Sequence, residues 1–241
     1  MTRVLISGAL ALGLAAGLAF WMTRAPETPP SLPVGGANAT EADSDAAAQP
    51  DADSDAAAQP DAENAPEVTE MTLGPADAPV TVMEYASFTC PHCADFHGST
   101  FKKLKADYID PGKVRYVYRD VYFDRFGLWA SMIARCGGEE RFFGITEMLY
   151  DKQKEWVGAG DPVGIANNLR KIGKAAGLGE DKINACLNNE AKAKALVAWF
   201  EENAKEHEIE ATPSLVIDGE THENMSYEDL AAIIDEKLAA Q

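Results

Sequence analysis

The segment that decides the fold is VTVMEYASFTCPHC, residues 80–93 of a chain of 241 residues. Its first part, residues 80–85, is almost continuously apolar and β-branched, which is typical of a central strand covered on both faces. The segment then reaches Cys90-Pro91-His92-Cys93 and continues with helical periodicity through about Tyr108. The sequence therefore predicts a strand that leads into a helix, with two cysteines where that helix begins.

Further strand signals lie on either side of a long helical stretch. Residues 114–121 alternate between apolar and polar side chains, as in a second strand. Near the C-terminus, the apolar run 213–217 ends at Asp218-Gly219, a hairpin turn signal, and a return strand is expected around residues 220–223. The last helix begins with the capping box Ser226-Tyr227-Glu228-Asp229.

The middle of the chain has helical periodicity and no comparable strand signal. From about residue 126 to 207, short helical stretches are separated by glycines. The predicted fold is therefore α/β, with a sheet built from residues 68–122 and 209–241. A helical subdomain is expected to be inserted between them, at about residues 123–208.

The N-terminal residues 1–24 predict a targeting or membrane segment. Residues 4–22 carry no charged side chain. As a helix they would span roughly 28 Å, close to the thickness of a bilayer core of about 30 Å. Two interpretations stay open: a signal anchor retained in the membrane, and a cleavable signal peptide with small residues at Gly17-Leu18-Ala19.

Residues 25–67 predict an acidic linker. They are mainly Ala, Pro, Asp, Glu, Ser and Gln, and residues 41–60 form a tandem repeat of ten residues. Such a composition cannot bury enough apolar area to offset the entropy lost on ordering. We therefore expect this segment to be disordered, with one folded domain over residues 68–241.

The charge balance limits the classes of partner. The chain has 21 Lys and Arg against 39 Asp and Glu, a net charge of −18. Affinity for nucleic acid comes largely from clustered basic side chains, so we expect no nucleic-acid partner. Eleven of the acids lie in residues 27–70, which contain no Lys or Arg, so the remainder is an ordinary acidic domain.

The four cysteines, in a chain with an export signal, indicate an oxidising compartment in which thiols pair. Four thiols allow three pairings. Cys90 and Cys93 are close enough in sequence to close a small ring, whereas Cys136 and Cys186 stand apart in the helical stretch. The favoured pairing therefore joins Cys90 to Cys93 and, as a structural disulfide, Cys136 to Cys186.

The position of Cys90 at the start of a helix favours its thiolate, because unpaired N–H groups and the positive end of the helix dipole lie beside the sulfur. A lowered pKa would make Cys90 the attacking and leaving sulfur and the disulfide oxidising. His92 can add a donor or a positive charge toward the same thiolate. Cys93, one turn into the helix, is expected to be the buried resolving thiol.

Other interpretations of a Cys-x-x-Cys pair are less well supported. A zinc site would require a second closely spaced Cys or His pair, and haem attachment would require His at position 94, which is Ala. We therefore expect redox chemistry without a cofactor or a metal, rather than a purely structural disulfide. A metal-binding module or metallochaperone that uses Cys90, His92 and Cys93 as soft ligands stays open as a function of a different class.

Residues 84–93, EYASFTCPHC, with Thr212-Pro213 opening a late strand, resemble the DsbA-type thiol:disulfide oxidoreductases of the bacterial envelope. The resemblance covers about residues 70–241 and implies a thioredoxin-like fold with an inserted helical subdomain. It implies that Cys90 is the nucleophile, Cys93 the resolving cysteine and Pro213 a cis proline whose neighbouring backbone pairs with the substrate. It also implies that Glu84 is a buried acid, and a carboxylate there could accept and return the Cys93 proton.

The function implied by this resemblance is a periplasmic enzyme that introduces disulfides into exported proteins. The implied partners are reduced exported proteins, as substrates, and a quinone-linked membrane reoxidase. Residues 4–22 would tether the enzyme to the inner membrane if they are retained.

Thr212 departs from the best-known oxidases of this group, which have Val there, and Thr is shared with isomerase-type relatives. An isomerase or reductase of the same fold is therefore the alternative. Those isomerases are dimers joined by an additional N-terminal domain, whereas this chain has a polar repeat in that region, so we expect a monomeric oxidase. His97, His207 and His222 lack ligand spacing, and we expect them to face solvent or to cap helices.

Overall fold

The structure is a computed structural model that describes residues 66–241. The expected targeting segment, residues 1–24, and nearly all of the expected linker, residues 25–67, lie outside the described residues. Within residues 66–241, no helix is both long enough and apolar enough to span a bilayer.

The described region is built around a five-stranded sheet with the strand order β1-β3-β2-β4-β5. The strands are β1 (Met71–Leu73), β2 (Val80–Ala86), β3 (Val114–Asp120), β4 (Ser214–Ile217) and β5 (Glu220–Glu223). Strand β2 pairs in parallel with β3 and antiparallel with β4, so the apolar run 80–85 lies in the centre of the sheet. The mixed sheet and its many helices confirm the predicted α/β class.

The sequence pattern does not predict β1. This strand has three residues and pairs antiparallel with β3 at the edge of the sheet. A strand of this length shows almost no periodicity, and its hydrogen bonds to β3 are what define it.

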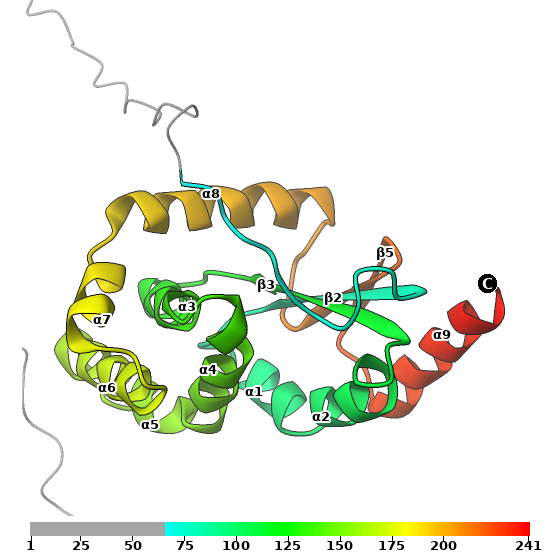
Figure 1. Cartoon of the computed structure of the whole chain (residues 1–241), viewed down its shortest axis with the longest axis horizontal. Coiled ribbons are helices and arrows are strands. Elements are labelled where there is room, and N and C mark those ends of the chain that lie inside the picture. The colour runs from blue at the N-terminus through cyan, green and yellow to red at the C-terminus, as the bar shows by residue number, and fades with distance from the viewer. Residues whose placement is uncertain (1–65) are drawn as a thin grey trace, which may run out of the picture. The chain divides into compact units, whose positions relative to one another are not determined.

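Helices surround the sheet (Figure 1). Those outside the predicted insertion are α1 (Pro91–Gly98), α2 (Thr100–Leu104), the π-helical turn η2 (Lys105–Ile109) and α9 (Tyr227–Ala239). Between β3 and β4 lie α3 (Arg125–Cys136), α4 (Glu139–Asp151), α5 (Gln153–Val157), α6 (Pro162–Ala175), α7 (Glu180–Leu187) and α8 (Glu190–Glu206). In Figure 1, α8 runs along one side of the sheet, α1, α2 and α9 lie on the other, and α3 to α7 gather at one end.

The helical stretch expected from the cysteines through about Tyr108 is present as α1, α2 and η2, with an interruption at one residue. The break is at Ser99, whose φ of −132° and ψ of −75° are not helical. Its hydroxyl donates to the carbonyl oxygen of Asp95 at 2.7 Å, which competes with the helical hydrogen bonds. Gly98 precedes it, and Gly and Ser are both less favourable in a helix interior than Ala.

The two faces of β2 pack against different layers because successive side chains of a strand point to opposite faces. Val80, Val82 and Ala86 belong to the main core. Tyr85 belongs instead to a smaller cluster on the opposite face, against which Phe200 of α8 packs. Glu84 shares the alternation of Val82 and Ala86, so the strand directs an acidic side chain toward the main core.

Candidate active site

The Cys90-Pro91-His92-Cys93 segment lies where α1 begins. Cys90 is the residue before the helix and Pro91 is the first helical residue, a position that suits proline because the N–H it lacks would have no partner within the helix. Cys90 is partly exposed, Cys93 is completely buried, and both are thiols in this structure. A reagent in solution can therefore reach Cys90 and not Cys93.

The surroundings of Cys90 stabilise its thiolate and lower its pKa to about 5. The largest cause is the hydrogen bond from the Cys93 thiol, and partial burial opposes it. Thr212 and the backbone N–H groups of Cys93 and His92 lower the pKa further. The side chain of His92 is exposed, so a role of its imidazole beside Cys90 stays a prediction.

The environment of Cys93 has the opposite effect. Burial raises the pKa of Cys93 far above its ordinary value, and the hydrogen bond to Cys90 and the charge of Glu84 act in the same direction. Cys93 is therefore a protonated thiol that donates to the Cys90 thiolate. The two thiols on one helix turn therefore have very different pKa values, lowered for Cys90 and raised for Cys93.

Glu84 is fully buried on β2. The hydroxyl of Tyr116, on the neighbouring strand β3, donates to its Oε2 atom. Burial, followed by the charge of Glu84, raises the pKa of Tyr116 well above its ordinary value, so this hydroxyl remains a donor. Within the part of the chain that the structure describes, Glu84 Oε1 has no hydrogen-bond partner.

Thr212 and Pro213 approach Cys90 from the other sequence block of the sheet. The Thr212–Pro213 peptide bond is cis, and Pro213 is buried immediately before β4. Cys90 Sγ lies 3.4 Å from the carbonyl oxygen of Thr212, to which it donates when it is protonated. The structure thus brings together Cys90, Cys93, Glu84, Thr212 and Pro213, while their roles in catalysis remain predictions.

Two contacts that the sequence analysis missed hold the loop before Cys90. Gln153 of α5 is buried, and its Nε2 atom donates to the carbonyl oxygens of Phe88 and Cys90, both at 2.8 Å. Thr89 donates to Asp124 at 2.8 Å, and Asp124 in turn caps the start of α3. No local pattern distinguishes Gln153 from the polar residues around it, so the sequence offered no signal for this role.

The expectation that His97 faces solvent or caps a helix is wrong. His97 is 6% exposed and lies beneath the active site, with Nε2 at 3.0 Å from Glu84 Oε2. Its ring stacks on Tyr150 of α4, with ring centroids 4.3 Å apart. His207 does lie at the end of α8, where its Nδ1 atom is 2.7 Å from the hydroxyl of Tyr85.

The other two cysteines lie away from this site. Cys136 at the end of α3 forms a disulfide with Cys186 of α7, across a sequence separation of 50 residues. It joins two helices of the segment between β3 and β4. Within residues 66–241, no group of three or more His, Cys, Asp or Glu side chains is arranged to hold a metal ion.

Comparison with known proteins agrees with this geometry. Residues 66–236 match a family model described as thioredoxin. A Rickettsia bellii protein whose name includes protein-disulfide oxidoreductase is 32% identical over 174 residues, which cover 70% of this chain and 64% of that protein. The disulfide bond formation protein D of Bacillus subtilis is 31% identical over 178 residues, 69% of this chain and 76% of that protein.

A solved structure gives the same picture. The crystal structure of Wolbachia pipientis alpha-DsbA1 matches with a TM-score of 0.66 and 26% identity, and the match covers 74% of this chain and 95% of that one. The thioredoxin-like fold implied by residues 84–93 and Thr212-Pro213 is therefore confirmed. The chain spans less than two thirds of the length of the Rickettsia protein.

Proposed function

The chain belongs to the thioredoxin family and, within it, to the DsbA-type disulfide oxidoreductases, and from this premise we propose that it introduces disulfides into exported proteins. The observation that carries the proposal is the contrast between two thiols on one helix turn. The pKa of the accessible Cys90 is lowered to about 5, and that of the buried Cys93 is raised. A dithiol whose reduced form is stabilised in this way has an oxidising disulfide.

The reaction starts from a Cys90–Cys93 disulfide. A substrate thiolate attacks Cys90 Sγ, which is the accessible sulfur, and the bond to Cys93 breaks. The Cys93 sulfur leaves as a thiolate and takes up a proton, because its buried site strongly disfavours the charge. A second substrate thiolate then attacks the substrate sulfur of the mixed disulfide, and Cys90 departs as a stabilised thiolate.

The electron and proton balance follows from these steps. The substrate loses two electrons and two protons and gains a disulfide. The enzyme gains the two electrons and one proton, which stays on Cys93, and the other proton enters solvent. The reduced enzyme must pass its electrons to an oxidant, and by resemblance we assign this step to a quinone-linked reoxidase in the membrane.

The location and the oligomeric state belong to the same proposal. The four cysteines and the apolar residues 4–22 favour a periplasmic location, with a tether to the inner membrane if the segment is retained. A monomer is proposed because the polar composition of residues 25–67 does not suit a dimerisation domain.

Thr212 favours one alternative, an isomerase or reductase of the same fold. The test is to measure the redox potential of the full-length protein in glutathione buffers, together with oxidation of a reduced peptide that contains two cysteines. An oxidase is expected to have a potential well above the thioredoxin value of about −270 mV and to oxidise the peptide stoichiometrically. A potential near about −270 mV would assign the chain to the reductases instead.

Three controls sharpen this test. Mixed with glutathione disulfide, Cys93→Ser is expected to accumulate a mixed disulfide between Cys90 and glutathione with release of one glutathione thiolate, because it lacks the thiol that would displace the second. Rearrangement of a scrambled substrate by the reduced protein, faster than net oxidation by the oxidised protein, would favour the isomerase. Stoichiometric binding of Cu(I) or Zn(II) with no disulfide exchange would favour the metal-binding module.

A further inference from the structure

The residues beneath the Cys90–Cys93 pair form a route from the core to a surface pocket. Cys93 and Glu84 are both completely buried, so neither can exchange a proton with bulk solvent directly. The reaction proposed above nevertheless requires Cys93 to gain a proton in one half-reaction and to lose it in the other. A group that connects this buried pair to solvent is therefore required.

His97 has the position that such a group requires. Its Nε2 atom lies at ion-pair distance from Glu84 Oε2, 3.0 Å, without the alignment of a hydrogen bond to any partner in residues 66–241. Its ring also lines a cavity of about 200 Å³ between α1, α2 and η2 on one side and α4 on the other. An imidazole can accept a proton on one nitrogen and release one from the other.

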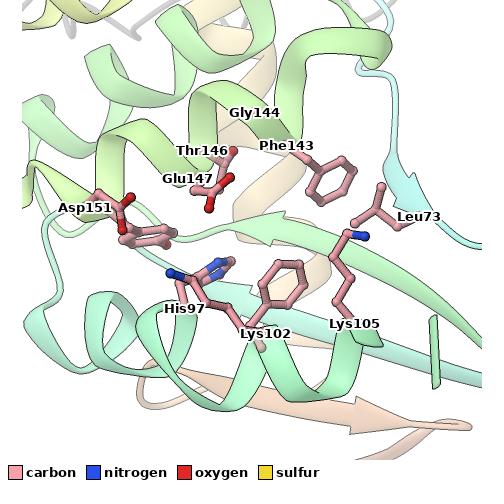
Figure 2. Close-up of a pocket in the computed structure, with 11 residues that line it drawn as sticks. Leu73, His97, Lys102, Lys105, Phe143, Gly144, Thr146, Glu147 and Asp151 are labelled. Carbon is pink, nitrogen blue, oxygen red and sulfur yellow. The ribbon is translucent and has the colours of Figure 1, made fainter. Parts of the chain in front are cut away.

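The cavity is suited to holding solvent. Figure 2 shows His97 and Lys102 on one wall and Thr146, Glu147 and Asp151 of α4 on the opposite wall. Lys102, Glu147 and Asp151 are exposed, so the mouth of the cavity is charged. A volume of about 200 Å³ has room for several water molecules at about 30 Å³ each.

A second polar side chain points to the same use of the cavity. Thr146 lines it, is 1% exposed, and its Oγ1 atom has no hydrogen-bond partner among the described residues. A buried hydroxyl without a protein partner is normally satisfied by water. Atoms without a hydrogen-bond partner among the described residues thus occur on the buried acid (Glu84 Oε1), on His97 (Nε2) and on the cavity wall (Thr146 Oγ1).

The other groups around His97 do not compete for this role. Tyr150 of α4 stacks on its ring, Tyr118 of β3 lies edge-on with centroids 5.9 Å apart, and Phe101 of α2 lies 4.7 Å away. Burial raises the pKa values of Tyr118 and Tyr150 well above their ordinary range, so both tyrosines keep their protons. Glu84 is the acid at ion-pair distance from the ring.

We propose that His97 relays the proton of Cys93 between Glu84 and the solvent of this cavity. The proposal rests on the proposed function and adds the exit route for the proton. When the reduced enzyme is reoxidised by a disulfide, Cys90 first forms a mixed disulfide and releases one thiolate of the oxidant. Cys93 then loses its proton to Glu84, its sulfur attacks Cys90 Sγ, and the second thiolate departs, while the proton passes through His97 to solvent.

The test separates the attack at Cys90 from the closure by Cys93. The reduced full-length protein is mixed rapidly with glutathione disulfide, loss of the Cys90 thiolate is followed by its ultraviolet absorbance, and closure is followed by mass spectrometry after acid quenching. The variant is His97→Phe, which keeps an aromatic ring against Tyr150 and Phe101. His222→Phe, on β5 and outside the cavity, is the matched control.

In the His97→Phe variant, closure is expected to slow about a hundredfold near pH 7, the lower end of the contribution of a positioned acid–base group. The attack at Cys90 is expected to be unchanged. In His97→Gly, added imidazole is expected to restore closure, a recovery that a purely structural role of His97 would not produce. This second variant keeps the test valid if His97→Phe does not fold.

Closure at the parent rate in a folded His97→Phe protein would overturn the relay, and so would slow closure in His97→Gly that imidazole does not restore. Failure of the proposed function looks different, because Cys90 in the parent protein would then react as an ordinary thiol or fail to oxidise a substrate dithiol. The two failures are distinguishable in one set of measurements.

Discussion

The side-chain amide of Gln153 lies 2.8 Å from the carbonyl oxygen of Cys90, so a helix of the inserted segment holds the loop that carries the accessible cysteine. The same amide donates to the carbonyl oxygen of Phe88. One side chain that is distant in sequence therefore holds two backbone oxygens of this loop, and the Cys90 oxygen also accepts from the Ala94 N–H at 3.3 Å.

Replacing Gln153 with Met is expected to lower the free energy of unfolding by about 1–3 kcal/mol, because it removes two hydrogen bonds and leaves the buried Phe88 carbonyl without its donor while nearly conserving side-chain volume. Urea unfolding of the oxidised protein measures the change. Asn168→Ala, which removes a surface amide bonded to a backbone carbonyl at 3.4 Å, is the control and should cost less than about 0.5 kcal/mol. Equal effects of the two substitutions would contradict the role assigned to Gln153.

The lowered pKa of Cys90 should appear in the pH dependence of the redox potential. Below about pH 5 the reduced pair carries two protons, and the redox potential should fall by about 60 mV per pH unit. Above about pH 5 Cys90 has lost its proton, and the potential should fall by only about 30 mV per pH unit. Substrate thiols keep their protons to about pH 8.5. The part of the oxidising advantage that comes from the lowered pKa of Cys90 is therefore full above about pH 8.5 and is lost as the pH falls through about 5. A slope that stays constant from acid pH up to about pH 8.5, where an ordinary thiol titrates, would disprove the shift.

Thr212→Val is expected to raise the pKa of Cys90, because Thr212 is one of the groups that lower it. Loss of this contribution, taken as about 1 kcal/mol, would change the redox equilibrium constant roughly fivefold, toward a less oxidising enzyme. Thr212→Ser keeps a hydroxyl and should retain most of the parent behaviour. Thiolate absorbance and glutathione equilibration measure the two quantities, and identical values for all three proteins would exclude the effect.

Asp120 and Arg135 form a buried ion pair, with side chains 1% and 4% exposed and Nη2 at 2.7 Å from Oδ2. Arg135→Met should lower the free energy of unfolding by about 3–5 kcal/mol, since it leaves a buried carboxylate without its partner. The double variant with Asp120→Leu should recover a large part of this loss, because it removes the stranded charge. A double-mutant cycle in urea checks the coupling, and additive losses would show that the pair is not coupled.

Removing the second disulfide should affect stability rather than catalysis. Cys136→Ala combined with Cys186→Ala releases a cross-link over 50 residues and is expected to cost about 2–4 kcal/mol. The rate of oxidation of a reduced peptide should stay at the parent value when both proteins are folded. A large fall in that rate would indicate that electrons pass through the Cys136–Cys186 pair.

The parts of the fold that the sequence predicts are those specified by local pattern. β2, β3 and the β4–β5 hairpin follow from apolar runs and one turn signal, and Ser226 caps α9, where its hydroxyl accepts from the Asp229 N–H at 3.1 Å. β1 is not predicted because its three residues show no clear periodicity and are defined as a strand by their pairing with β3. Local patterns of this kind require no knowledge of the tertiary contacts.

The candidate site divides in the same way. The motif of residues 90–93 is visible in the sequence because its members are adjacent. The positions of His97 and Gln153 are not, since each depends on residues brought from another part of the chain: Tyr150 stacks on His97, and Gln153 reaches back to the loop at Phe88. His97 lies buried beside Glu84 because of tertiary packing, which no spacing in the sequence indicates.

The contact of Cys90 with Thr212 joins residues 122 positions apart, so Thr212 is synthesised well after both cysteines. A ribosome delivers both cysteines long before the segment that completes their surroundings. The contribution of Thr212 to the lowered pKa of Cys90 is thus added only when the segment before β4 joins the sheet. Part of the reactivity of Cys90 is consequently acquired late, when the C-terminal block of the sheet has been made.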